Sequence, residues 1–202
     1  MIRALILDAD GVLIDGDRAS VVFARERGIT PAMTGSFFSG PFRDCLVGAA
    51  DLKQCIAPHL PGWGWRGTVQ AYLDYWFAAE DHLDEALLAE VARHRAAGIR
   101  CYVATNQERY RTEYMRDAMA FGEHFDAIFS SADVGYTKDD RRFFDRLKRD
   151  LAPIGADEML FWDDGPINLE TARAAGLHAE LYTTLAAFRE LTGRYLAGEA
   201  TS

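Results

Sequence analysis

The sequence predicts an α/β fold, a doubly wound parallel sheet with an inserted α-helical unit, from three observations. The apolar residues 4–7 form a run that is typical of a strand buried on both faces. From residue 85 onward, helical and strand patterns alternate with short connections, which indicates repeated βα units around a parallel sheet. Residues 15–84 lack strand-like apolar runs and show helical patterns broken by Gly and Pro. We therefore expect a core of residues 1–14 and 85–202 and an inserted helical unit of residues 15–84.

Within the insertion, we expect helices over residues 19–27, from Pro31 onward and over residues 68–79. Gly28 follows the first of them at a position typical of a C-cap, and Thr30 with Pro31 opens the second. Aromatic residues are dense in this unit, and we expect most of them to fill its small hydrophobic core.

In the core, each expected element follows a local pattern. Leu87 and Val91 lie at helical spacing ahead of Gly98, a residue typical of a helix C-terminus. Pro166 and Gly176 bracket another helix, since proline favours the first helical turn and glycine the position after the last. The expected strands are residues 4–7, 99–104, 127–129, 158–162 and 177–182, and the expected helices are residues 85–97, 107–120, 139–151, 166–175 and 185–196.

Composition and charge narrow the classes of function. The chain has 202 residues, 49% of them hydrophobic, and a formal net charge of -9. This charge disfavours binding to a nucleic-acid backbone but allows a small phosphorylated metabolite held by local cations and Mg²⁺. The three cysteines show no C-x-x-C spacing, which favours reduced thiols, and no apolar span approaches the length of a membrane helix. We expect a cytoplasmic protein, a monomer or homodimer, without nucleic-acid or membrane partners.

Two aspartates follow the first expected strand directly. Asp8 and Asp10 emerge at its C-terminal end, the edge where open α/β sheets bind their ligands. Side chains two apart on an extended segment point the same way, so both carboxylates converge on one metal or phosphate unless the chain has already turned. Gly11 supplies such a turn. A polar turn with solvated carboxylates remains the alternative interpretation of this motif alone.

Further polar residues follow the other expected strands. Thr105 and Asn106 lie where a helix N-terminus favours an anion, although Thr105 alone is also typical of an N-cap. Lys138 lies ahead of a helix, where it opposes the helix dipole unless carboxylates or a phosphate offset it; a solvated lysine is the alternative. Asp163 and Asp164 end another strand, and acidic strand tips side by side repel each other unless a divalent cation such as Mg²⁺ lies between them.

The order of these features resembles the haloacid dehalogenase-like superfamily, and the resemblance covers the whole chain. The insertion looks like the helical cap of the subfamily IA-like group, which contains many phosphatases of small metabolites. The sequence departs from the pattern of this family at two positions. Relatives usually have proline after the lysine, where this chain has Asp139. Many relatives also have an acidic residue at the position of Ile167, and here Asp164 would supply that second carboxylate. The matching motifs are Asp8-Ala9-Asp10-Gly11-Val12-Leu13, Thr105 after Val103-Ala104, Lys138, and Asp163-Asp164-Gly165-Pro166-Ile167-Asn168 with the later Ala172-Arg173-Ala174-Ala175-Gly176.

The resemblance implies a Mg²⁺-dependent phosphatase that forms an aspartyl-phosphate. It implies Asp8 as the nucleophile and Asp10 as the acid and base. Thr105, Asn106, Lys138 and the turn at Gly11 would bind the phosphate group, and Asp8, Asp10 (through its carbonyl), Asp163 and Asp164 would hold the metal. An acid at position 10 favours phosphoryl chemistry, since halide departure needs no proton.

Two alternatives to a phosphatase stay open. A phosphomutase would use the same residues, and a catalytically silent member would bind a ligand or partner through the cap. On the cap itself, Arg43 or Arg66 is a hypothetical grip for an anionic part of the substrate.

Overall fold

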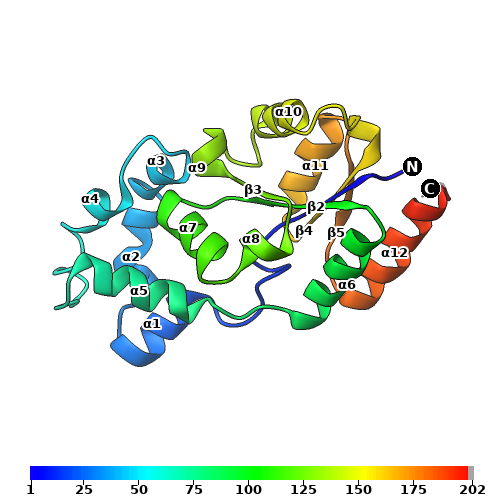
Figure 1. The fold of residues 1–202 in the computed structure, drawn as a ribbon. Helices are drawn as coiled ribbons and strands as arrows, with labels where there is room; N and C mark the ends of the chain where they lie inside the picture. The colour runs from blue at the N-terminus through cyan, green and yellow to red at the C-terminus, as the bar shows by residue number, and fades with distance from the viewer. Residues whose placement is uncertain (200–202) are drawn as a thin grey trace.

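The protein is built around a five-stranded parallel sheet (Figure 1). A computed structural model describes residues 1–199. The strands follow the order β3-β2-β1-β4-β5, so β1 lies at the centre with β2 and β4 beside it. Their bounds are β1 Ala4–Leu7, β2 Arg100–Thr105, β3 Ala127–Ser130, β4 Met159–Asp163 and β5 His178–Leu181. The fold class predicted from the sequence is thereby confirmed.

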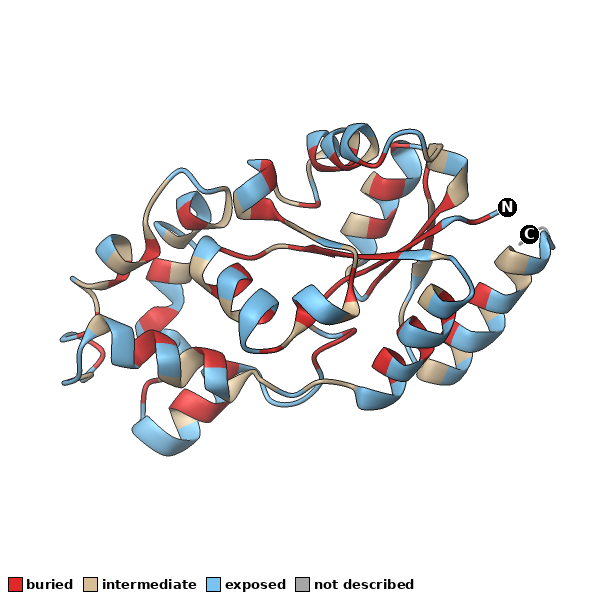
Figure 2. Ribbon diagram, in the orientation of Figure 1, coloured by how far each residue is buried: buried red, intermediate tan, exposed pale blue. Residues whose placement is uncertain are grey.

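Helices cover both faces of this sheet, which explains why the central strand β1 is apolar throughout. Leu5 and Leu7 of β1 belong to the hydrophobic cluster on one face, and Ala4 and Ile6 to the cluster on the other. Figure 2 shows the strands as a buried layer between helices with exposed outer sides. The first face carries α6 (Glu85–Ala96), α7 (Arg109–Asp117), α8 (Phe121–His124) and α12 (Leu185–Ala197), and the second carries α9 (Ser131–Val134), α10 (Arg141–Asp150) and α11 (Pro166–Ala174).

Five helices between β1 and α6 form a group with a hydrophobic cluster of its own. They occupy one end of the molecule, away from the chain termini (Figure 1). Stacked and edge-on aromatic pairs fill this cluster, such as Phe23 against Tyr72 at 4.8 Å between ring centroids. The five are α1 (Ala19–Arg27), α2 (Pro31–Phe38), α3 (Phe42–Leu46), α4 (Leu52–Ile56) and α5 (Val69–Ala79). The sequence predicted α1, α2 and α5 but not α3 and α4, which are too short to show periodicity.

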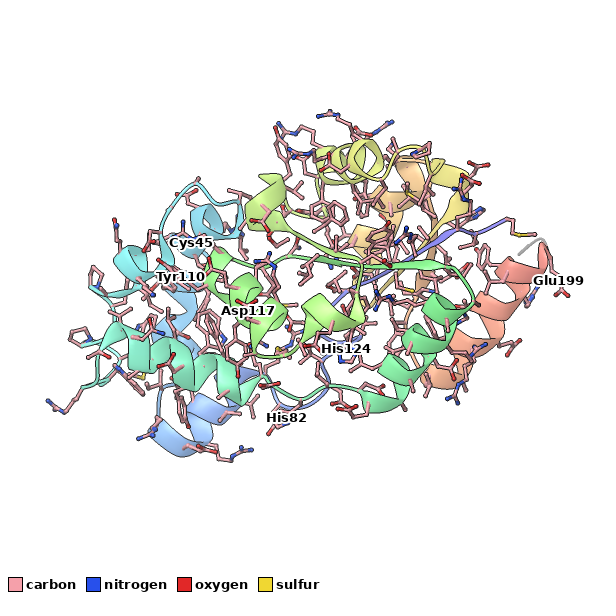
Figure 3. All side chains as sticks on the ribbon, in the orientation of Figure 1. Cys45, His82, Tyr110, Asp117, His124 and Glu199 are labelled. Atoms are coloured by element: carbon pink, nitrogen blue, oxygen red, sulfur yellow. The ribbon has the colours of Figure 1, made fainter. Side chains whose placement is uncertain are left out.

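The α1–α5 segment is tied to the sheet-bearing part through α7. Arg111 is buried and donates to the backbone carbonyls of Phe77 and Glu80, at 2.9 and 2.7 Å, in the last turn and at the C-cap of α5. The Tyr110 hydroxyl donates to Asp51 at 2.6 Å. Figure 3 shows Tyr110 and Cys45 of α3 close to each other on this boundary, where both line a cavity of about 210 Å³.

The expected helix over residues 107–120 is divided. α7 ends at Asp117, and the separate helix α8 begins at Phe121. Between them, Ala120 adopts a left-handed conformation with φ of 56°, which turns the chain out of the first helix. No helix in the described part of the chain is both long and apolar enough to cross a membrane.

Candidate active site

The predicted site residues gather at the C-terminal edge of the sheet. Asp8 follows β1, Thr105 ends β2 and Asp163 ends β4, and these three strands are neighbours in the sheet. Parallel strands place their carboxyl ends on the same edge, so the tertiary fold brings these residues together. All three side chains are buried, and so is Lys138 in the loop ahead of α10.

Lys138 links two of the aspartates directly. Its Nζ lies 2.6 Å from Asp8 Oδ1 and 2.7 Å from Asp163 Oδ2. The backbone N–H of Lys138 donates to Asn106 Oδ1 at 2.8 Å, so the residue after β2 holds the loop that carries the lysine. The opposing charge that a lysine ahead of a helix requires is therefore supplied by Asp8 and Asp163.

Asp163 is fixed on both of its oxygen atoms. Oδ1 accepts from the backbone N–H of Gly165 at 2.7 Å and from Asn168 Nδ2 at 3.0 Å, while Oδ2 faces Lys138. Asn168 lies on α11, so the first turn of this helix orients the carboxylate at the tip of β4. The sequence motif contained Asn168, but its role as a positioning residue follows only from this geometry.

Three carboxylates lie close enough to share one cation. Ligand oxygens of Asp8, Asp163 and Asp164 all lie within 4.8 Å of one another. Gly11, with φ of 85°, makes room for this arrangement, because a Cβ atom there would come within 2.3 Å of Asp164 Oδ2. Oxygen donors of this kind suit a hard divalent cation such as Mg²⁺.

The electrostatics of the group also fit a cation. Burial raises the pKa of Asp8; the charge of Lys138 opposes this effect, and the charge of Asp163 adds to it. Burial, followed by the charge of Asp163, raises the pKa of Asp164. The pKa of Lys138 is raised against the effect of its burial, because Asp8 and Asp163 surround the ammonium group. One ammonium group thus faces three close carboxylates, and a divalent cation would balance the remaining negative charge.

Asp10 lies apart from this group, with a different partner. Its Oδ2 accepts from Gln107 Nε2 at 2.5 Å, and the carboxylate lines a cavity of about 140 Å³. The Asp8 and Asp10 side chains therefore contact different residues, Lys138 and Gln107 respectively. The two carboxylates are thus placed to act on different atoms of a bound molecule.

Three residues that the sequence did not single out border this site. Gln107 holds Asp10, and Arg18 and Glu80 line the same cavity as Asp10. By contrast, Arg43 and Arg66 are exposed and do not line this cavity or the larger one beside it. No periodic pattern in the sequence marks Arg18 or Glu80 as facing the site.

Comparisons with known proteins agree with this fold. The family model of haloacid dehalogenase-like hydrolases matches residues 2–176. No curated protein matches the chain. A HAD-like family hydrolase structure from Porphyromonas gingivalis is 22% identical with a TM-score of 0.79, and the alignment covers 95% of this chain and 98% of that one.

Two further solved structures are similar. A HAD family enzyme from Bacteroides thetaiotaomicron, in complex with magnesium and inorganic phosphate, is 18% identical with a TM-score of 0.75, covering 95% of this chain and 99% of that chain. L-2-haloacid dehalogenase from Xanthobacter autotrophicus, with chloropropionic acid covalently bound, is 18% identical with a TM-score of 0.66. The alignment covers 100% of this chain and 85% of the dehalogenase chain. At these identities the structures show a shared fold, and the family model covers most of the sequence. This chain belongs to the haloacid dehalogenase-like hydrolases.

Proposed function

We propose that this hydrolase is a Mg²⁺-dependent phosphatase, which cleaves the phosphate monoester of a small metabolite through an aspartyl-phosphate on Asp8. The observation that carries the proposal is the separation of two acids: Asp8 faces Lys138 and Asp163, whereas Asp10 faces Gln107 and a cavity. A nucleophile and a proton donor need different positions around a phosphate group. The magnesium and phosphate complex of the similar Bacteroides thetaiotaomicron enzyme supports this assignment.

In the first step, an Asp8 oxygen attacks phosphorus while Asp10 gives its proton to the departing alcohol oxygen. In the second step, Asp10 takes a proton from water, which attacks the same phosphorus and releases phosphate from Asp8. Thr105, Asn106, Lys138 and the backbone around Gly11 would bind the phosphate group, and Lys138 would stabilise charge on its non-bridging oxygens. Asp8, Asp163 and Asp164, with the carbonyl of Asp10, would hold Mg²⁺, which supplies electrostatic screening between carboxylate and phosphate.

The similar dehalogenase makes halide displacement the main competing reaction. A halide ion leaves without a proton, so that reaction has no use for an acid beside the leaving group. Asp10, directed at a cavity and held by Gln107, favours an alcohol as the leaving group. A phosphomutase and a catalytically silent ligand-binding protein would share the same residues and need separate tests.

We further propose that residues 15–84 act as a cap that selects the leaving group and excludes bulk water. Support comes from the independent hydrophobic cluster of α1–α5 and from Arg18 and Glu80, which lie beside Asp10 in one cavity. A cytoplasmic location and a monomeric or homodimeric state remain expectations.

The test uses acetyl phosphate and p-nitrophenyl phosphate, with Mg²⁺ or with EDTA. We expect turnover that requires Mg²⁺ and is abolished in Asp8→Asn but kept in Asp157→Asn, the same change at an exposed aspartate away from the site. Asp10→Asn should slow alkyl phosphates by about 10²- to 10⁴-fold and aryl phosphates much less, because a phenolate leaves without protonation. Halide release from 2-chloropropionate, or dependence on a sugar bisphosphate, would contradict the phosphatase; ligand binding with no turnover would indicate the silent alternative.

A further inference from the structure

A second cavity lies next to the one that contains Asp10. Its volume is about 320 Å³, and it is lined by α1, α2 and α5 of the α1–α5 segment. Arg18 and Glu80 line both cavities, so the two spaces adjoin at these residues. A part of the substrate that extends from the Asp10 cavity into the second cavity therefore passes Arg18 and Glu80.

The walls of this second cavity are mainly apolar and aromatic. They include Phe23, Phe38, Tyr72 and Trp76 with Ile29 and Pro31. These rings support one another: Phe23 stacks on Tyr72 at 4.8 Å, and Phe38 meets Trp76 edge-on at 5.5 Å between centroids. Such mutual packing leaves the rings little freedom to collapse into the space between them.

Two of the polar side chains that line the cavity, Glu80 and Thr34, are already engaged. The Glu80 carboxylate accepts from the Ala19 backbone N–H at 2.8 Å and from Trp76 Nε1 at 2.9 Å. Thr34 Oγ1 donates to the Thr30 carbonyl at 3.4 Å. Within residues 1–199, the lining hydroxyls without a hydrogen bond belong to Ser20 and Tyr72, too few for the several hydroxyl groups of a sugar. Each buried hydroxyl without a partner weakens binding by about tenfold or more.

Charge at the junction further restricts the occupant. Arg18 is exposed, and within residues 1–199 its side chain forms no hydrogen bond or ion pair, so its guanidinium is available to the phosphate group. Glu80 lines the same junction, and its carboxylate repels a second anionic group on the leaving alcohol. The two residues thus favour a phosphate at one end of the substrate and an uncharged group at the other.

We infer that the leaving group is an apolar alcohol, with an aromatic ring or a compact aliphatic body that occupies the cavity between α1, α2 and α5. This inference rests on the proposed phosphatase function and names the substrate class for it. An apolar cavity of about 150 Å³ in another protein holds benzene, so a cavity of this size has room for one ring or for two fused rings. Binding is favoured by the apolar area that the ring removes from water.

Gly35 allows the cavity to be filled without disturbing the fold. It lies on α2 and lines the cavity, and a Cβ atom built there meets no other atom within 4 Å. A leucine at this position therefore projects into open space in a helix, where glycine itself is unfavourable. Gly193 on α12 is a matched control, because it is also a helical glycine with open space around it and lies outside the cavity.

The experiment compares phosphate esters of primary alcohols, so that leaving-group acidity is nearly constant. We expect kcat/KM for 2-phenylethyl phosphate to exceed that for glycerol phosphate and a hexose 6-phosphate by about tenfold or more. Gly35→Leu should remove this preference and leave methyl phosphate, which is too short to reach the cavity, unchanged; Gly193→Leu should change neither. A preference for the hexose ester, or an equal loss on all esters in Gly35→Leu, would overturn the inference.

Binding of 2-phenylethanol, followed by tryptophan fluorescence, separates this inference from the proposed function. If no ester is hydrolysed, the phosphatase proposal fails, and the binding measurement alone decides the chemistry of the cavity. Saturable binding that is lost in Gly35→Leu and kept in Gly193→Leu supports an apolar ligand. Absence of saturable binding in the unmodified protein refutes it.

Discussion

Replacing Lys138 by methionine tests whether its buried ammonium group holds the acidic centre together. Methionine keeps the unbranched, apolar part of the side chain but removes the charge that contacts Asp8 and Asp163 at 2.6 and 2.7 Å. The lysine side chain is 2% exposed, so water cannot replace the lost contacts. Removing one partner of a buried ion pair typically costs about 3–5 kcal/mol. At about 2–4 °C per kcal/mol for a chain of this size, Tm should fall by about 6–20 °C.

Thermal and urea unfolding, both in EDTA so that no divalent cation substitutes for the ammonium group, measure this loss. Lys148→Met is the control: its Nζ contacts Asp145 at 2.9 Å and donates to the Ala175 carbonyl at 2.8 Å, but the Lys148 and Asp145 side chains are 24% and 42% exposed. Water can replace these contacts, so the cost should stay at about 1–2 kcal/mol. In an Asp8→Asn background, Lys138→Met should cost about 1–3 kcal/mol less, because one uncompensated carboxylate is gone. A loss in Lys138→Met no larger than in Lys148→Met, or strict additivity with Asp8→Asn, would refute the reasoning.

Three further outcomes are expected. Arg18→Gln should raise KM about tenfold for every phosphate ester, long or short, with little change in kcat, since Arg18 lines the same cavity as Asp10 and its side chain has no partner among residues 1–199. Unchanged steady-state KM values would contradict this role. Iodoacetamide at pH 8 should label Cys55 first, because burial raises the pKa of both Cys45 and Cys101 to about 12 and leaves few thiolates at these two residues. Peptide mass spectrometry shows the order of labelling. The control is urea-unfolded protein, in which all three cysteines react. Burial also raises the pKa of Glu108 from 4.5 to about 7, so the folded state keeps the Glu108 proton to a higher pH than the unfolded state does. The contribution of Glu108 to the free energy of unfolding therefore falls by about 3 kcal/mol as the pH rises from 4.5 through 7. Urea unfolding at pH 5 and pH 8 should show a smaller decline in Glu108→Gln than in the unmodified protein, and equal declines would argue against it.

Much of the fold follows from local sequence patterns. The four apolar residues of β1 predict a central strand because both faces of a doubly wound sheet are covered, and the structure buries all four. Proline at the start of α11 and glycine after its end mark that helix in the sequence. The short helices α3 and α4, and the break at Ala120, escaped prediction because a few residues carry no measurable period.

The sequence by itself determined that three polar residues end up at one edge of the sheet, where the candidate site lies. Asp8, Thr105 and Asp163 each follow an apolar strand, and parallel strands necessarily gather their carboxyl ends on one edge. Only the tertiary structure decided what each side chain does there: that Lys138 reaches both Asp8 and Asp163, and that Asp10 turns to Gln107. The physical reason is that local patterns report contacts within a few residues along the chain. The contacts of Arg18 and Glu80 with the two cavities join segments that lie far apart in the sequence, and their geometry depends on how the α1–α5 segment packs against the sheet.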